Sequence, residues 1–172
     1  MAVTLHTNHG DLKIELACDL VPKIAFNFLA LAASGAYNGT LFHRNVAGFL
    51  VQGGDPTKTG KGGECIWGGK MADQFHPRLR HSGRGIVAMA TSKPDSIGSQ
   101  FYITYAAQPQ LDNVCSIVGR VLHHGTMPVL DDLEGVPVKG KKFRPVDDII
   151  IRHVSIQANP FAEQRLPVES FR

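Results

Sequence analysis

The sequence predicts a mainly-β fold in which short antiparallel strands form a barrel capped by helices. Three observations support this prediction. Short apolar runs, several of them β-branched, recur along the chain at intervals of about eight to fifteen residues. Only two stretches place apolar residues at the spacing of a helix. Turn signals rich in glycine separate the runs, as is typical of barrels built from many short strands.

The chain begins with a predicted hairpin and a helix. Residues 3–6 and 12–16 are mostly apolar and flank Asn8-His9-Gly10, where glycine supplies the backbone freedom of a tight turn. Pro22 favours a helix start, because the N–H that proline lacks has no partner in a first turn. Apolar residues then recur at helical spacing as far as Gly35, where we expect the helix to end.

The rest of the domain is expected to consist of strands, one long loop and one short helix. The loop covers residues 53–69, and loops of this length in compact domains are usually functional. The short helix is expected around residues 127–133. The expected strands cover residues 41–43, 49–52, 86–90, 100–105, 116–121 and 146–156. The predicted domain therefore spans residues 1–157, and residues 158–172 form a predicted C-terminal tail.

Composition argues against several classes of function. The 172 residues are 43% hydrophobic and 19% charged, which is ordinary for a globular domain, and no apolar run reaches the roughly 20 residues of a membrane span. The formal charge of +3 is spread along the chain, whereas nucleic-acid binding needs clustered Lys and Arg. The three cysteines form no zinc or disulfide pattern, which indicates reduced thiols. With no secretory signal pattern at the start, we expect a nuclear or cytoplasmic protein that is not secreted.

Three motifs suggest other chemistry and fail on detail. Residues 54–61 resemble a phosphate-binding loop, but one residue too many separates the glycines, and Gly62 replaces the hydroxyl that binds magnesium. Gly98-Ser99-Gln100 resembles part of a nucleophile elbow, but Phe101 stands in place of its second glycine. The eight histidines include the pair His123-His124 but no helical metal-binding spacing.

The most informative segment is Phe42-His43-Arg44-Asn45-Val46-Ala47-Gly48-Phe49-Leu50-Val51-Gln52-Gly53-Gly54-Asp55. It places Arg44, Phe49 and Gln52 on two adjacent short strands joined by a turn at Gly48. An arginine that faces inward is costly unless another group engages it. On the residues alone, an ion pair with a core carboxylate and a functional role both remain open.

This segment resembles the signature of the cyclophilins. In that family Phe-His-Arg precedes Gly-Phe-Met and Gln-Gly-Gly-Asp. Further likeness lies in residues 98–103, Met89-Ala90, Leu111-Asp112 and residues 118–121, in collinear order from about Val3 to Ile156. The resemblance implies a closed, eight-stranded antiparallel barrel capped by two α-helices, and peptidyl-prolyl cis–trans isomerase activity on X–Pro bonds. That activity assists protein folding or conformational switching and needs neither cofactor nor metal.

The resemblance also implies roles for individual residues. The implied catalytic residues are Arg44, as the donor to the proline nitrogen, and Gln52, which holds the guanidinium. Phe49, Leu50, Tyr102 and Leu111 correspond to the proline pocket, and Ala90, Thr91 and Gln100 to positions that bind the flanking peptide. The remaining implied substrate-binding positions are His43, interpreted mainly as a support, and Cys115.

A finer resemblance is to the isomerase-like type three subgroup, which associates with the spliceosome. It rests on Thr4-Leu5-His6-Thr7, Phe143-Arg144-Pro145 and residues 158–162. It implies spliceosomal proteins as partners. We also expect a monomer that binds proline-containing peptides and proteins, and the composition predicts no contact with membrane and no direct contact with nucleic acid.

The chain departs from the family pattern at the pocket. Leu50 replaces Met, Tyr102 replaces Phe, Thr91 replaces Asn and Cys115 replaces a frequent His. Gln110 stands where cyclosporin-sensitive members carry Trp, so we expect weak cyclosporin binding. Two alternatives to an active isomerase stay open: a proline-binding module of a larger assembly with incidental catalysis, and a structural domain without either function.

Overall fold

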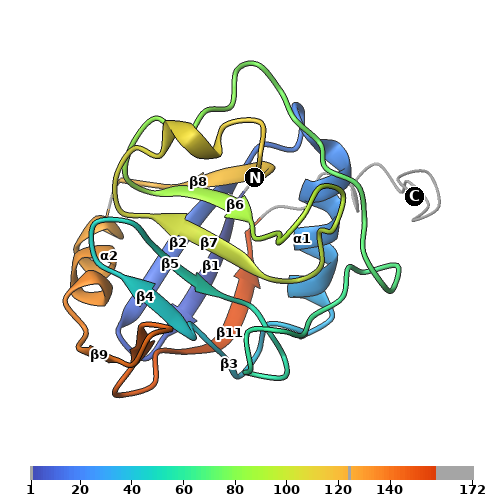
Figure 1. Ribbon diagram of the computed structural model, residues 1–172. Helices are drawn as coiled ribbons and strands as arrows, with labels where there is room; N and C mark the ends of the chain where they lie inside the picture. The colour runs from blue at the N-terminus through green and yellow to red at the C-terminus, as the bar shows by residue number, and fades with distance from the viewer. Residues whose placement is uncertain (1, 124, 158–172) are drawn as a thin grey trace.

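The computed structural model describes residues 2–123 and 125–157 (Figure 1). Nine strands form one sheet in the order β3-β11-β1-β2-β8-β6-β7-β5-β4, and every pairing within it is antiparallel. The strands are β1 Ala2–Thr7, β2 Gly10–Leu16, β3 Thr40–Leu41, β4 Arg44–Val46, β5 Leu50–Gly53, β6 Ile86–Met89, β7 Phe101–Thr104, β8 Ile117–Val121 and β11 Ile150–Ile156. The other elements are α1 Pro22–Ala33, η1 Pro109–Leu111, α2 Met127–Glu134, β9 Val138–Lys139 and β10 Arg144–Pro145.

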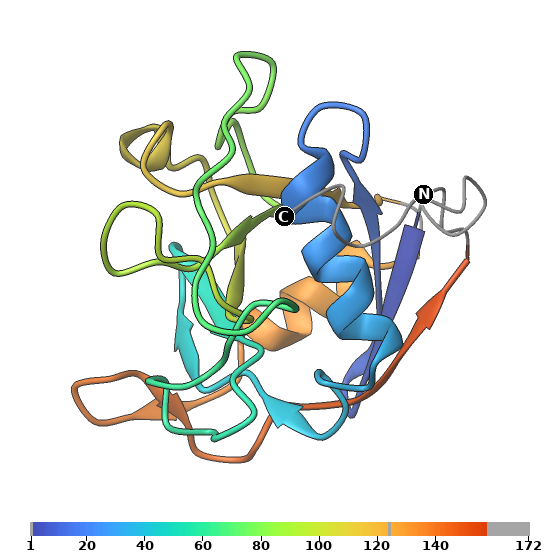
Figure 2. The same ribbon diagram turned by 90° about the vertical axis from the view of Figure 1, so that its right-hand side faces the viewer.

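The sheet curls, and the two helices lie on opposite sides of it (Figures 1 and 2). The predicted mainly-β class with two α-helices is confirmed. The closed eight-stranded barrel is shown only in part, because the sheet has nine strands and its order has two ends, β3 and β4. An antiparallel bridge joins Leu41 of β3 to Asp55, just beyond β5, which is the neighbour of β4 in the sheet.

The predicted hairpin and first helix are confirmed. β1 and β2 pair from Ala2 opposite Glu15 to Thr7 opposite Gly10, and the φ of +126° at Gly10 is one that side-chain-bearing residues rarely adopt. Pro22 is the first residue of α1, and the helix ends at Ala33, two residues before the expected Gly35. The apolar face of α1 packs into the main core with β1, β2 and β8.

The strand expected at residues 41–43 is divided in the structure. β3 ends at Leu41 and pairs with β11, whereas β4 begins at Arg44 and pairs with β5, at the other end of the sheet. Phe42 and His43 carry the chain between these two ends and therefore belong to neither strand. A similar shift makes β11 begin at Ile150 rather than at Val146, whose N–H donates to the carbonyl of Pro137.

The apolar side chains form two clusters. The main core lies between the curled sheet and α1, and its aromatic rings meet largely edge to face, such as Phe28 and Phe101 at 5.3 Å. A smaller floor cluster consists of Leu50, Ala88, Tyr102, Cys115 and Ile117. Leu79 packs against both clusters.

Two further points concern the extent of the fold. Among the residues that the structure describes, no helix has both the length and the apolar character to cross a bilayer. The predicted tail, residues 158–172, lies outside the described residues, as do residues 1 and 124 of the predicted domain.

Candidate active site

A cavity of about 620 Å³ opens above the floor cluster. Five separate parts of the chain contribute to it, namely β4 with β5, the loop after β5, the end of β6, β7 and the segment around η1. These parts bring together ten of the eleven residues predicted for the site: Arg44, Phe49, Leu50, Gln52, Ala90, Thr91, Gln100, Tyr102, Leu111 and Cys115.

Arg44 and Gln52 meet across the β4–β5 ladder. They are direct cross-strand partners, and Nη1 of Arg44 donates to Oε1 of Gln52 at 3.5 Å. The guanidinium carbon of Arg44 lies 5.7 Å from the centre of the Phe49 ring, within cation–π distance. Phe49 itself belongs to the turn before β5 rather than to the strand that was predicted for it. Within the part of the chain that the structure describes, no carboxylate pairs with this guanidinium, unlike the core ion pair considered from the sequence.

Gln100 extends this arrangement to the long loop. Nε2 of Gln52 donates to Oε1 of Gln100 at 2.9 Å. Nε2 of Gln100 in turn donates to the carbonyl oxygens of Gly60 and Gly62, at 3.0 and 2.9 Å. A continuous chain of hydrogen bonds thus runs from the loop through two glutamines to Arg44.

The loop owes its shape to the carboxylate of Asp55, which is fully buried. The carboxylate accepts bonds from the backbone and hydroxyl of Thr57, both at 2.8 Å, and from the backbone N–H groups of Gly60 at 2.7 Å and Gly62 at 3.2 Å. Burial alone would raise the pKa of Asp55, but these donors outweigh it and lower the pKa to about 2. The anion is therefore the structural centre of the cavity's rim.

The floor of the cavity holds a buried polar group. The hydroxyl of Tyr102 meets Nε2 of His81 at 2.7 Å, and Nδ1 of His81 meets Oδ1 of Asp112 at 2.8 Å. Burial first, and then the neighbouring Cys115 thiol, raise the pKa of Tyr102 above its ordinary value. The hydroxyl that the sequence adds at this position therefore has a partner. Sequence reasoning missed His81, because no local pattern indicates a contact with residues 21 and 31 positions away.

His43 is the predicted site residue that does not line the cavity. It lies beside the loop, where a Cβ on Gly60 would come within 3.2 Å of its ring. Its Nδ1 is buried and has no hydrogen-bond partner among the described residues. Burial lowers the pKa of His43, with the Asp55 carboxylate opposing that effect. His43 therefore lies beside the loop and not on the cavity wall, and its role as a support stays a prediction.

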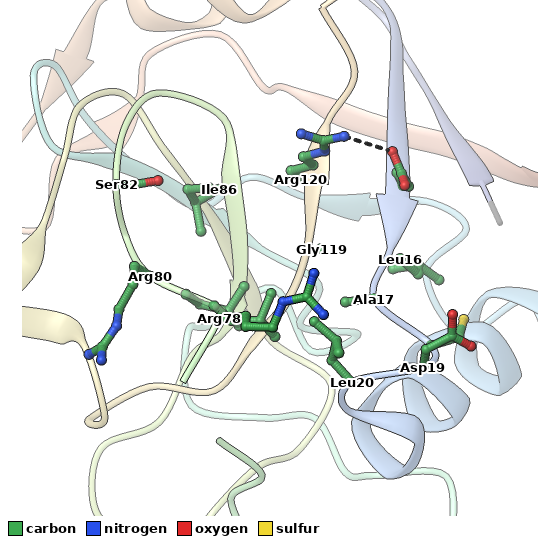
Figure 3. Close-up of a pocket in the computed structure, with 14 residues that line it drawn as sticks. Leu16, Ala17, Asp19, Leu20, Arg78, Arg80, Ser82, Ile86, Gly119 and Arg120 are labelled. Atoms are coloured by element: carbon green, nitrogen blue, oxygen red, sulfur yellow. Dashed lines mark hydrogen bonds and ion pairs between the residues drawn. The ribbon is translucent and has the colours of Figure 1, made fainter. Parts of the chain in front are cut away.

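A second cavity of about 820 Å³ lies elsewhere, over β2, β8 and the segment of residues 78–82 (Figure 3). Arg78, Arg80 and Arg120 line it, and Arg120 makes an ion pair with Glu15 at 3.3 Å. It contains none of the residues predicted for the site. The residues predicted for the site therefore select the cavity of about 620 Å³ as the candidate active site.

The site contains no evident metal-binding group. Within residues 2–123 and 125–157, no set of three His, Cys, Asp or Glu side chains is placed to hold a metal ion. The cavity is lined by one guanidinium, three lysine side chains, amide and hydroxyl groups, and apolar surface.

Comparison with known proteins gives one consistent result. A family model described as "Cyclophilin type peptidyl-prolyl cis-trans isomerase/CLD" matches residues 2–156. The chain is 54% identical over 162 residues to peptidyl-prolyl cis-trans isomerase-like 3 of Gallus gallus, covering 94% of this chain and 99% of that protein. The Homo sapiens protein of the same name is 51% identical over 163 residues, covering 95% and 100%. A crystal structure of a Cryptosporidium parvum cyclophilin type isomerase, obtained in the presence of the dipeptide Ala-Pro, superposes with a TM-score of 0.87 at 46% identity, covering 92% of this chain and 100% of that one.

Proposed function

The chain belongs to the cyclophilin-type peptidyl-prolyl cis–trans isomerases, and from this premise we propose that Arg44 catalyses rotation about X–Pro bonds. One observation carries the proposal. The Arg44 guanidinium lies at the cavity, next to the Phe49 ring and bonded to Gln52, and no carboxylate of the described residues neutralises it.

The chemistry of the reaction requires such a group and little else. Amide resonance sets a barrier of about 18–20 kcal/mol for rotation, and no covalent bond changes. As the C–N bond twists, the proline nitrogen regains its lone pair and becomes a hydrogen-bond acceptor. A donor aimed at this nitrogen interacts with the twisted amide far more strongly than with the planar ends, and this difference lowers the barrier. Arginine suits the role because its charge is permanent and its fork is rigid.

The other residues bind and orient. Gln52 and Gln100 hold the guanidinium through the chain of hydrogen bonds that ends at the loop. Phe49, Leu50, Tyr102 and Leu111, with Cys115 at the wall, form the surface that grips the proline ring. Ala90, Thr91 and Gln100 bind the flanking peptide, and His43 supports the loop behind it.

The test is isomerisation of a short Ala-Pro peptide, followed by NMR exchange. One preorganised charged donor contributes about 3–4 kcal/mol, so Arg44→Ala should slow catalysis by a factor of about 10²–10³. Arg44→Lys should stay well below the native rate, since lysine lacks the planar fork. Arg120→Ala removes an exposed arginine outside the cavity and serves as the control. An Arg44→Ala rate within threefold of the native rate contradicts the proposal.

A second function, a proline-binding module of a larger assembly, draws on the composition of the floor. Tyr102 adds a hydroxyl where the family has Phe, and Cys115 puts a small thiol where the family often has the polar ring of His. If the native protein binds the peptide, seen as shifted resonances, but does not accelerate exchange, the module is the better description.

We also propose a nuclear role within the spliceosome, in protein folding or conformational switching. Its support is the resemblance to the isomerase-like type three subgroup. Proteins named peptidyl-prolyl cis-trans isomerase-like 3 are also 51% and 54% identical to the chain over nearly its whole length. Affinity capture from nuclear extract, with Arg44→Ala and native baits compared, should recover splicing factors. Recovery of chaperone clients alone argues against this role, and fluorescence microscopy of the tagged protein tests the location.

Weak cyclosporin binding remains a prediction for this chain. Gln110 is exposed and its amide donates to the side chain of Gln108 at 2.7 Å, so it offers no indole to pack on a macrocycle. A titration that gives nanomolar affinity would refute it.

A further inference from the structure

We propose that His81 is a positioning residue of this isomerase: it anchors the Tyr102 hydroxyl beneath the cavity floor and so fixes the ring that grips the substrate proline. The proposal rests on the proposed function, because it assigns Tyr102 to the proline-binding surface. His81 does not line the cavity, so it acts only through its neighbours.

Each polar atom of His81 has a hydrogen-bond partner. Its side chain is 0% exposed. Nε2 lies 2.7 Å from the Tyr102 hydroxyl, and the two rings lie 6.0 Å apart with an angle of 21° between their planes. On either side, Arg80 and Ser82 line the other, outer cavity (Figure 3). The chain thus turns one imidazole inward from a segment whose adjacent side chains face outward.

The backbone of His81 ties a second wall of the cavity to the same point. Its N–H donates to Oδ1 of Asp112 at 2.6 Å, and its carbonyl accepts from the N–H of Gln108 at 3.0 Å. Gln108 and Asp112 flank η1, which carries Leu111 into the cavity. His81 therefore links β7, through Tyr102, to η1, through Asp112, and both linked elements contribute to the proline-binding surface.

The contacts of His81 with Asp112 and Tyr102 determine which of its ring nitrogens carries a hydrogen. Burial alone would raise the pKa of Asp112, but the backbone and imidazole N–H groups of His81 lower it, so the carboxylate is an acceptor. Nδ1 of His81 must then carry the hydrogen, and in that tautomer Nε2 holds a lone pair. The Tyr102 hydroxyl donates to that lone pair. Its hydrogen consequently points beneath the floor rather than toward the bound proline.

His81 and Arg44 therefore have different roles, which the kinetic constants KM and kcat can distinguish. Without His81, the Tyr102 hydroxyl has lost its buried acceptor, and the ring must turn toward another partner or toward water. A displaced ring weakens the grip on proline, which raises KM, while Arg44 and its supporting glutamines remain in place. After Tyr102→Phe there is no hydroxyl for His81 to hold, so replacing His81 in that background should not change KM.

The experiment is a double-mutant cycle of His81→Asn and Tyr102→Phe, read by NMR exchange and by titration of an Ala-Pro peptide. Asparagine keeps a nitrogen in reach of Asp112 but is too short for the Tyr102 hydroxyl. We expect His81→Asn to raise KM and the peptide Kd about tenfold, with kcat within threefold of native. In the Tyr102→Phe background, the same change should alter neither by more than twofold. Ser82→Ala, at an exposed neighbouring residue, is the control.

Two results would overturn the proposal. An equal rise in KM in both backgrounds would mean that His81 acts as general scaffolding, and an unchanged KM in the native background would mean that it has no positioning role. The peptide Kd does not depend on catalysis, so it tests the anchor even if Arg44→Ala leaves the rate unchanged and the proposed catalytic role fails.

A spectroscopic measurement guards against misfolding of the asparagine variant. In the native protein, the ¹⁵N resonance of His81 Nε2 should be that of an unprotonated nitrogen accepting a hydrogen bond, and Tyr102→Phe should shift it toward that of a free lone pair. A protonated Nε2 in the native protein at neutral pH, or no shift in the variant, would contradict the anchor.

Discussion

Replacement of Asp55 by asparagine should destabilise the protein in a manner that depends on pH. The native carboxylate is buried and accepts bonds from Thr57, Gly60 and Gly62, among others. Its pKa falls from an ordinary 3.8 to about 2 in the folded state. A lowered folded-state pKa stabilises the native state above the ordinary value, and this stabilisation disappears as the pH falls through the folded value.

The magnitude follows from the two pKa values. A drop of about 1.8 pH units at 1.36 kcal/mol per unit corresponds to about 2.4 kcal/mol at neutral pH. At pH 3, where much of the unfolded-state carboxyl is protonated but the folded one remains ionised, about 1.3 kcal/mol is left. The difference in unfolding free energy between the native protein and Asp55→Asn should therefore shrink by about 1.1 kcal/mol between pH 7 and pH 3. The contacts that the asparagine side chain makes at position 55 change the unfolding free energy by an amount that does not depend on pH.

Urea denaturation of both proteins at the two pH values measures this quantity. Asp132→Asn, which removes an exposed carboxylate from α2, corrects for the loss of one charge. A destabilisation by Asp55→Asn that is the same at pH 7 and pH 3 would refute the reasoning. Because Gly60 and Gly62 hold Gln100, the variant should also lower kcat more than it raises KM.

Two further predictions concern stability alone. Asn45→Ala removes the bonds of this buried amide to the carbonyl of Leu133 and the hydroxyl of Tyr105, and should cost about 2–4 kcal/mol in urea denaturation; a loss below about 1 kcal/mol would contradict it. Gly119→Ala places a Cβ against a main-chain oxygen of β2 and should lower the free energy of unfolding by more than about 2 kcal/mol. The control is Gly83→Ala, which has open space around its Cβ and should change the urea midpoint little. Equal effects of the two substitutions would show that the close approach at Gly119 does not determine stability.

The fold was largely predictable where local patterns determine local structure. The turn at Asn8-His9-Gly10 and the proline at the start of α1 are encoded by residues that act on their own backbone. β9 and β10 were missed, since strands of two residues leave no alternation to detect. The division between β3 and β4 was missed for another reason: it depends on which distant strand each half pairs with.

The site was predictable to the extent that it resembles a known signature. Arg44, Phe49 and Gln52 lie within one short segment, and the ladder from β4 to β5 brings the first and last of them together. Tyr102 was identified, but its partner His81 was not, because that contact joins segments that only the completed fold places side by side. The sequence also suggested His43 for substrate binding, although its ring lies behind the loop.

The existence of a floor cluster separate from the main core has a consequence for engineering. Leu50, Tyr102 and Cys115 shape what the cavity accepts, yet they pack with each other and with Ala88 and Ile117 rather than within the main hydrophobic core. All three side chains are buried, so changes selected there for a new sequence preference also alter packing and carry a cost in stability. A combinatorial library that keeps the total side-chain volume at these positions close to native would vary recognition while limiting that cost.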